Sequence, residues 1–192
     1  MAILGRLCHL NPAYGLPALR TTLLQLMTDI EYARCHHQRE EAARLLGALL
    51  ANATHLIRPY TASIFAATLP RVADSDAAVS AAVLRALGHL AAADSHAVVP
   101  FAPRLLRLIV EALRDPASIA RRHAALAALS PLLRATGHVA ESSPYLRYPE
   151  LLPTLLAMIS TERGADLRCE LLRALGTLGA LDPSTQAGHR KW

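Results

Sequence analysis

The residues best suited to chemistry form a small cluster of cysteines and histidines near the N-terminus. Cys35, His36 and His37 are consecutive, and Cys8 and His9 lie upstream. A tetrahedral zinc site takes ligands that converge on the ion, usually in pairs with about two to five residues between the two ligands. Adjacent side chains on a helix instead point about 100° apart, so this spacing does not favour a shared ion. We interpret the cluster as a solvated turn between helices and expect no metal site.

The short motifs of common enzyme classes do not occur in the sequence. There is no glycine-rich phosphate loop, no GxSxG nucleophile elbow, no HExxH zinc motif and no kinase HRD or DFG triplet. Asp29 and Glu31 are two residues apart and would point to different faces of a helix, which excludes them as a general acid–base pair. We therefore expect no catalytic residue, no cofactor site and no small-molecule substrate for this chain.

Positive charge is the remaining chemical feature. The chain has 20 basic and 15 acidic residues, which gives a net charge of +5. The arginines are spread along the sequence with no basic block and no interleaved aromatic residues, so we expect no nucleic-acid partner. Arg121, Arg122 and His123 form one local patch that suits a phosphate or an acidic partner, although a solvated helix start is the more common reason for such a run.

The elements that must position these side chains recur at a nearly constant interval. A leucine followed by glycine or serine recurs at intervals of 42, 41, 42 and 46 residues. The pairs are Leu4–Gly5, Leu46–Gly47, Leu87–Gly88, Leu129–Ser130 and Leu175–Gly176. A period in this range is typical of HEAT or armadillo arrays, in which one helical hairpin cannot bury its apolar faces alone and stacks on its neighbours. Glycine is unfavourable in a helix, so its recurrence indicates a close approach between helices.

The predicted fold is all-α, a right-handed α-solenoid of antiparallel helix pairs. The chain is 53% hydrophobic but only 4% aromatic, and no alternating β-branched run indicates a sheet. We expect a single solenoid segment over residues 1–192, with four units at about 17–52, 57–92, 98–135 and 149–181. Residues 1–11 would be the end of a preceding repeat, and 184–192 a frayed tail. Apolar positions predicted to be buried include Ile119 in the third unit, Leu156 in the fourth and Leu175 in the last helix.

Charged residues follow the same period. Arg39, Arg122 and Arg168 each precede the small residue of their unit by eight positions, and Ser80 interrupts the series. Acidic residues lie in or next to the turns between the paired helices, at Asp74, Asp115 and Glu162. We favour an internal ladder of acid–arginine pairs that joins successive turns, which would fix the register of neighbouring units. The alternative is a basic stripe that binds a partner.

Four blocks of this repeat resemble the HEAT-repeat region of the target-of-rapamycin (TOR) kinases. They are LGRLCHLNPA at Leu4–Ala13, HLIRPY at His55–Tyr60, the stretch from ATGHV to ELLPTLL at Ala135–Leu156, and RALGTLGALDP at Arg173–Pro183. Their order and spacing match that family from about Leu4 to Pro183. The turn at Asp74–Ala78 is shorter than in the family, and the tail after Pro183 is expected not to match.

The resemblance implies a non-catalytic scaffold segment of a nutrient-sensing serine/threonine kinase of the PI3K-related class, in contact with TOR-complex subunits and with the rest of the parent solenoid. No kinase or rapamycin-binding segment is present, so no catalytic residue is carried over, and ATP and magnesium would belong to the parent's kinase domain. The alternative is a stand-alone adaptor that binds a peptide or helix in its concave groove. Three cysteines without motif spacing and the lack of a signal sequence or apolar span predict a cytoplasmic location, with the nucleus or the surface of endomembranes also possible through partners.

Overall fold

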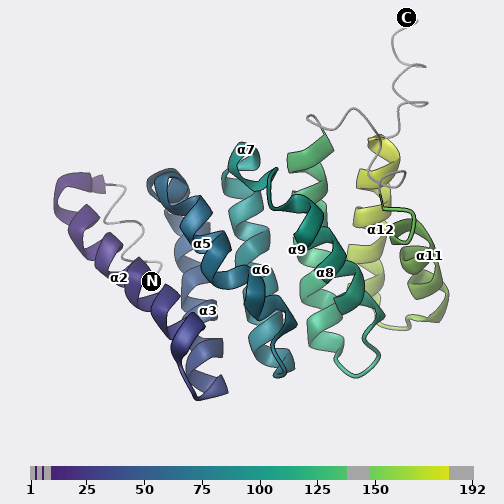
Figure 1. Ribbon diagram of the computed structural model, residues 1–192. Helices are drawn as coiled ribbons and strands as arrows, with labels where there is room; N and C mark the ends of the chain where they lie inside the picture. Colours follow the sequence, from purple (N-terminus) through teal and green to yellow (C-terminus); the bar gives the residue numbers. More distant parts are fainter. Residues whose placement is uncertain (1–2, 4–5, 7–9, 138–147, 182–192) are drawn as a thin grey trace, which may run out of the picture.

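The computed structural model describes residues 3, 6, 10–137 and 148–181 of the chain, and every regular element in these ranges is a helix. The helices follow one another as antiparallel pairs that stack into an elongated two-layer array (Figure 1). The predicted all-α solenoid is therefore confirmed. Two predicted stretches lie wholly or mostly outside the described residues, namely the helix end at 1–11 and the tail at 184–192. Most of the segment between the third and fourth predicted units, 136–148, lies outside them as well.

One layer consists of the second helix of each pair. It contains α3 (His36–Asn52), α6 (Ala77–Ala93), α9 (Ile119–Gly137) and α12 (Ala165–Ala180). Each of these helices packs against the next along the array. α9 continues through Pro131, a residue that cannot donate a backbone hydrogen bond within the helix.

The other layer holds the first helix of each pair. Its main helices are α2 (Pro12–Tyr32), α5 (Thr61–Thr68), α8 (Ala102–Arg114) and α11 (Leu151–Thr161). Short helical turns precede or follow two of them, namely α4 (Thr54–Ile57), η1 (Arg58–Tyr60), η2 (Leu69–Ala73) and α7 (Ser95–Val98). This layer is more broken than the other one.

Prolines account for two differences from the predicted helices. The first helix of the second unit was expected to be continuous from about residue 57 to 72, but 3₁₀ turns interrupt it at Pro59 and Pro70, where the backbone lacks a donor. The first helix of the first unit begins at Pro12 instead of Pro17. Pro17 therefore lies inside this helix, on its exposed side, where it removes one backbone hydrogen bond.

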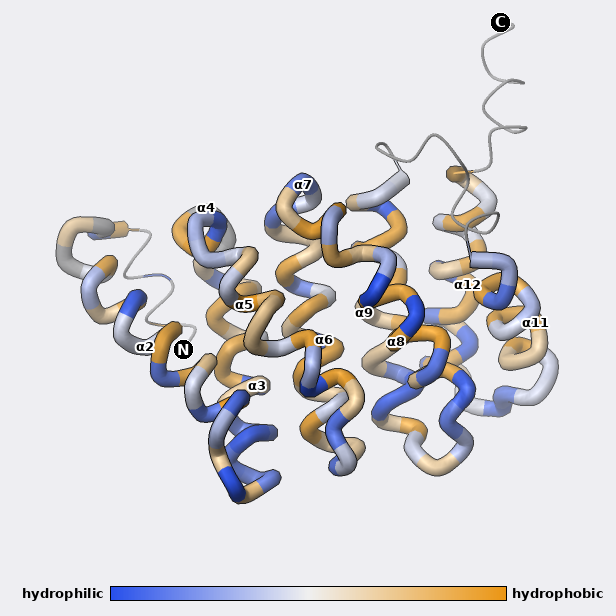
Figure 2. The backbone as a smooth tube through the Cα atoms, viewed as in Figure 1, coloured by the Kyte–Doolittle hydropathy of each residue, from blue (hydrophilic) through white to orange (hydrophobic). Residues whose placement is uncertain are grey.

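The core lies between the layers and between successive pairs. The repeated leucines Leu46, Leu87 and Leu129 are completely buried, whereas Leu175 in α12 is only partly buried. Two expected core residues are exposed: Ile119 is 66% accessible at the start of α9, and Leu156 is 50% accessible on α11. Figure 2 shows hydrophilic residues at the turns along the lower edge of the array, which is where the charged series lies.

Candidate functional site

The best-formed polar contact between units joins α3 to the turn before α6. Nε of Arg39 donates to Oδ2 of Asp74 at 3.1 Å, and Nη2 donates to Oδ1 at 3.1 Å. Nη1 of the same arginine donates to the carbonyl of Ala33 at 3.0 Å. The side chains of Arg39 and Asp74 are 13% and 2% accessible. A two-point pair of this kind fixes both distance and orientation.

Asp74 keeps its negative charge although it is buried. Burial is the largest effect on its pKa and raises it, but the backbone N–H of Asp76 and the guanidinium of Arg39 act together in the opposite direction, and Arg71 adds to them. The net result is a pKa below the ordinary value of 3.8. Asp74 is therefore ionised at neutral pH. It accepts hydrogen bonds from the guanidinium of Arg39 in α3 and from the backbone N–H of Asp76 in its own turn.

A second contact of the same register joins α9 to the turn before α12. Nη2 of Arg122 lies 3.5 Å from Oε2 of Glu162, and both side chains are less than one-fifth accessible. Oε1 of Glu162 accepts from the backbone N–H groups of Arg163 and Gly164. Glu162 thus holds the start of α12 and the neighbouring unit at the same time.

The middle of the series is arranged differently because Ser80 replaces an arginine. Oγ of Ser80 donates to the carbonyl of Val72 at 2.6 Å, inside its own unit. Arg121 spans the gap instead: Nη1 donates to Asp115 at 3.2 Å, and Nη2 donates to the same Val72 carbonyl at 3.3 Å. The third unit is therefore joined to the second through Arg121, a residue for which the sequence offered only a partner patch or a solvated helix start.

The Arg121–Arg122–His123 patch is thus largely occupied by contacts inside the array. Arg121 and Arg122 each pair with a carboxylate, and their Nε atoms are buried without a hydrogen-bond partner among the described residues. His123 is half-buried. The two guanidinium charges are compensated, which leaves little free positive charge for an external anion.

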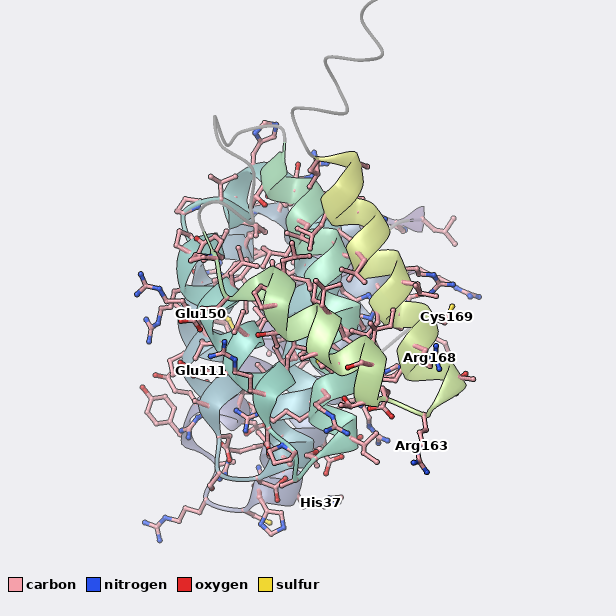
Figure 3. The ribbon with its side chains drawn as sticks, turned by 90° about the vertical axis from the view of Figure 1, so that its right-hand side faces the viewer. His37, Glu111, Glu150, Arg163, Arg168 and Cys169 are labelled. Atoms are coloured by element: carbon pink, nitrogen blue, oxygen red, sulfur yellow. The ribbon has the colours of Figure 1, made fainter. Side chains whose placement is uncertain are left out.

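Arg168 is the member of the series that stands apart. It is exposed on α12, and within residues 10–137 and 148–181 its guanidinium has no ion pair or hydrogen bond. Figure 3 shows Arg168 and Cys169 projecting from α12 at the edge of the molecule.

A hollow of about 400 Å³ lies between α8 and the residues before α11, where Glu111 and Glu150 appear in Figure 3. Its polar lining is Arg107, Glu111, Arg114, Tyr148 and Glu150. Arg114 pairs with Glu150 at 2.8 Å, and the lining includes no serine, cysteine or histidine. Elsewhere in the described chain, no three histidine, cysteine or acidic side chains are grouped as metal ligands, and Cys35 and Cys169 are exposed free thiols.

Two family profiles match the chain. A profile described as a HEAT-like repeat matches residues 36–90, and one described as the serine/threonine-protein kinase mTOR domain matches residues 142–191. The second match extends past Pro183, so the expectation that similarity ends there is wrong. Among solved structures, the crystal structure of an engineered protein superposes with a TM-score of 0.66 at 17% identity, over 80% of this chain and 61% of that one. At that identity the likeness shows the fold alone.

Curated relatives extend the similarity to nearly the whole chain. Serine/threonine-protein kinase tor1 of Schizosaccharomyces pombe is 42% identical, and the TOR kinase of Oryza sativa is 40% identical, each over 95% of this chain. TOR2 of Saccharomyces cerevisiae is 36% identical over 94%. The chain spans only 7–8% of the length of these relatives. The resemblance to the HEAT-repeat region of TOR kinases is thereby confirmed. None of the helices in the described part of the chain combines the length and apolarity needed to cross a bilayer.

Proposed function

We propose that this chain is a non-catalytic HEAT-repeat scaffold segment of a TOR-type serine/threonine kinase. The observation that carries the proposal is similarity to TOR kinases along 95% of the chain, in a segment that makes up 8% of their length. The kinase activity, with its ATP and magnesium, would belong to another part of the parent protein. The segment would work in the cytoplasm and take no small-molecule substrate.

The physical contribution of the segment is a stack of units in fixed register. Buried leucines supply most of the stability but little directional preference, whereas the contacts of Arg39, Arg121 and Arg122 with the neighbouring unit set the relative position of the turns. Such a stack holds distant surfaces at a defined separation, as repeat proteins do when they present extended binding faces. Its partners would be proteins, namely subunits of the kinase complex and neighbouring repeats.

A stand-alone adaptor with a peptide in its concave groove is the less favoured function. The fold alone is compatible with it, because solenoids of this kind host many activities. The near-complete alignment with TOR kinases favours the scaffold segment.

The test is to precipitate the native protein with an antibody against this chain and measure both its size and its activity. A band far above 20.6 kDa, together with ATP-dependent phosphorylation of serine or threonine peptides by the precipitate, is expected. The purified 192-residue chain should show no such activity. A native band at 20.6 kDa without co-precipitating kinase activity would contradict the proposal and favour the adaptor.

A further inference from the structure

A polar hollow of about 350 Å³ lies in the surface between α9 and α12. Its volume is within the range of sites that hold small molecules, and it shares no lining residue with the hollow beside α8. Its lining includes residues of both helices, namely Ala127, Ser130, Pro131 and Arg134 of α9 and Glu170 and Arg173 of α12.

The sequence of α9 departs from that of the other second helices at two positions of the repeat, and both departures shape this hollow. Three residues before the repeated small residue, the other helices carry an exposed arginine, whereas α9 carries Ala127. Four residues after it, the others carry alanine, whereas α9 carries Arg134. The short side chain of Ala127 leaves space that an arginine would fill. The equivalent residues are Arg44, Arg85 and Arg173 at the first position and Ala51, Ala92 and Ala180 at the second.

Positive charge exceeds negative charge in the lining. Arg134 is exposed, and within residues 10–137 and 148–181 its guanidinium has no ion pair or hydrogen bond. Nη1 of Arg173 lies 2.5 Å from Oε1 of Glu170 on the same helix, but the arginine side chain is 66% accessible, and such an exposed pair is weak. Two guanidinium groups from facing helices can therefore donate to one oxyanion.

Uncharged polar groups in the same lining lack their usual partners. Ser130 is only 8% accessible, and its Oγ is buried without a hydrogen-bond partner in the described part of the chain. Pro131 has no N–H, so the carbonyl of Ala127, four residues earlier, lacks the donor that a helix normally supplies. Leaving a buried polar group unpaired is costly. The hydroxyl groups of a ligand could satisfy both.

We propose that the hollow between α9 and α12 binds a small phosphate monoester that also carries hydroxyl groups, of the class of sugar phosphates. A phosphate has three oxygens that can accept from Arg134 and Arg173 at once, and the hydroxyl groups of the ligand pair with Ser130 and the carbonyl of Ala127. The molecule is a bound ligand and not a substrate. This inference rests on these residues and not on the relation to TOR kinases.

The test is a titration of the ¹⁵N-labelled full chain, followed through its amide NMR signals at about 0.15 M salt and about pH 7.5, where the phosphate is mainly doubly charged. Glucose 6-phosphate supplies both halves of the proposed chemistry, inorganic phosphate only the charge, and glucose only the hydroxyl groups. Glucose 6-phosphate should cause saturable shifts confined to α9 and α12. Inorganic phosphate should bind at least about tenfold more weakly, and glucose should cause no shifts.

Charge variants distinguish the hollow from general attraction of anions to a basic chain. Arg134→Gln and Arg173→Gln should each weaken binding of glucose 6-phosphate about three- to tenfold. Arg85→Gln is the matched control, because Arg85 is exposed at the register position of Arg173 but lies on α6, outside the hollow. It should leave binding unchanged.

Two further variants test the shape and the hydroxyl of the site. Ala127→Arg adds positive charge but fills the hollow, so it should abolish binding, and the fold should tolerate it because arginine stands at this position in the other helices. Ser130→Ala should weaken glucose 6-phosphate at least about threefold and leave inorganic phosphate unaffected. The same spectra show whether each variant is folded, and if Ala127→Arg is not, the exposed Arg134→Gln and Arg173→Gln still decide.

Three results would overturn the proposal. The first is the absence of saturable shifts in α9 and α12 with glucose 6-phosphate. The second is equally tight binding of inorganic phosphate, which would mean that the hydroxyl groups are not recognised. The third is an equal effect of Arg85→Gln and Arg173→Gln, or stronger binding to a folded Ala127→Arg chain, either of which would mean that net charge and not the hollow attracts the anion.

Discussion

Arg39 and Asp74 lie 35 residues apart in the chain and meet in a two-point ion pair, with both N–O distances at 3.1 Å. Their side chains are almost completely removed from water. The arginine also binds the carbonyls of the turn in its own unit, so a single guanidinium links the turns of two successive units. By contrast, the Arg122–Glu162 pair has one contact at 3.5 Å and is expected to be weaker.

Replacing Asp74 by asparagine should destabilise the chain by about 2 kcal/mol, because a buried arginine loses its counter-charge while the side chain keeps its size. Asparagine retains an oxygen that can accept from the N–H of Asp76, so the loss reports mainly on charge. The free energy of unfolding in urea is the measurement. Glu41→Gln serves as the control, since the Arg44–Glu41 pair is exposed and its loss should change stability by less than about 0.5 kcal/mol. If the two substitutions lowered the free energy of unfolding equally, the buried Arg39–Asp74 pair would contribute no more to stability than the exposed Arg44–Glu41 pair.

The same carboxylate makes stability depend on pH. Its pKa in the folded chain is below the ordinary value of 3.8, so its contribution is complete above that value and is lost as the pH falls through the folded pKa. The difference in unfolding free energy between the native chain and Asp74→Asn should therefore narrow between pH 7 and about pH 3. Urea titrations of both proteins at the two pH values measure it. If the difference in unfolding free energy were the same at both pH values, Asp74 would not titrate in this range.

The period of the leucine–glycine pair was enough to predict the second helices of the four units, because helical burial repeats locally along the sequence. Leu46, Leu87 and Leu129 lie in the core for that reason. The first helices were harder to predict. The sequence shows Pro59 and Pro70, but whether proline breaks a helix or is tolerated in its first turn depends on where the helix starts.

The charged contacts likewise include some that could be predicted from the sequence and one that could not. Arg39 and Arg122 could be related to the acidic turns because they keep a constant distance from the repeated small residue. The role of Arg121 could not be predicted. It depends on the carbonyl of Val72, which lies 49 residues away and becomes its partner only when the units stack. A missing arginine at Ser80 was the visible signal, although it did not indicate which neighbour would replace it.

Leu171 and Leu172 are adjacent in α12 but should respond very differently to truncation. Leu171 is completely buried, whereas Leu172 is 58% accessible. Leu171→Ala should cost about 2–4 kcal/mol through lost burial and the cavity that remains. Leu172→Ala should change stability by less than about 0.5 kcal/mol. Thermal or urea unfolding of both variants tests the orientation of α12, and a larger effect at Leu172 would mean that the helix is rotated about its axis.

Glycine-to-alanine substitutions at equivalent positions should have opposite signs. Alanine is favoured over glycine in a helix by about 1 kcal/mol. At Gly176 a new Cβ meets nothing within 4 Å, so Gly176→Ala should stabilise the chain by up to that amount. At Gly88 the Cβ would lie 3.0 Å from Cα of Ala128 and 3.3 Å from its Cβ. The backbone of α9 would have to move, and the resulting strain should exceed the gain in propensity.

Gly47→Ala is the matched intermediate case for this comparison, because its new Cβ would make ordinary contacts at 3.6 Å and beyond. It should behave like Gly176→Ala. Unfolding free energies of the three variants, measured side by side, distinguish helix propensity from packing, since propensity alone predicts the same gain at all three positions. Gly88→Ala should be the only destabilised variant, by about 1 kcal/mol. If it were as stable as the other two, α6 and α9 could separate without loss, and close approach would not explain the glycine at position 88.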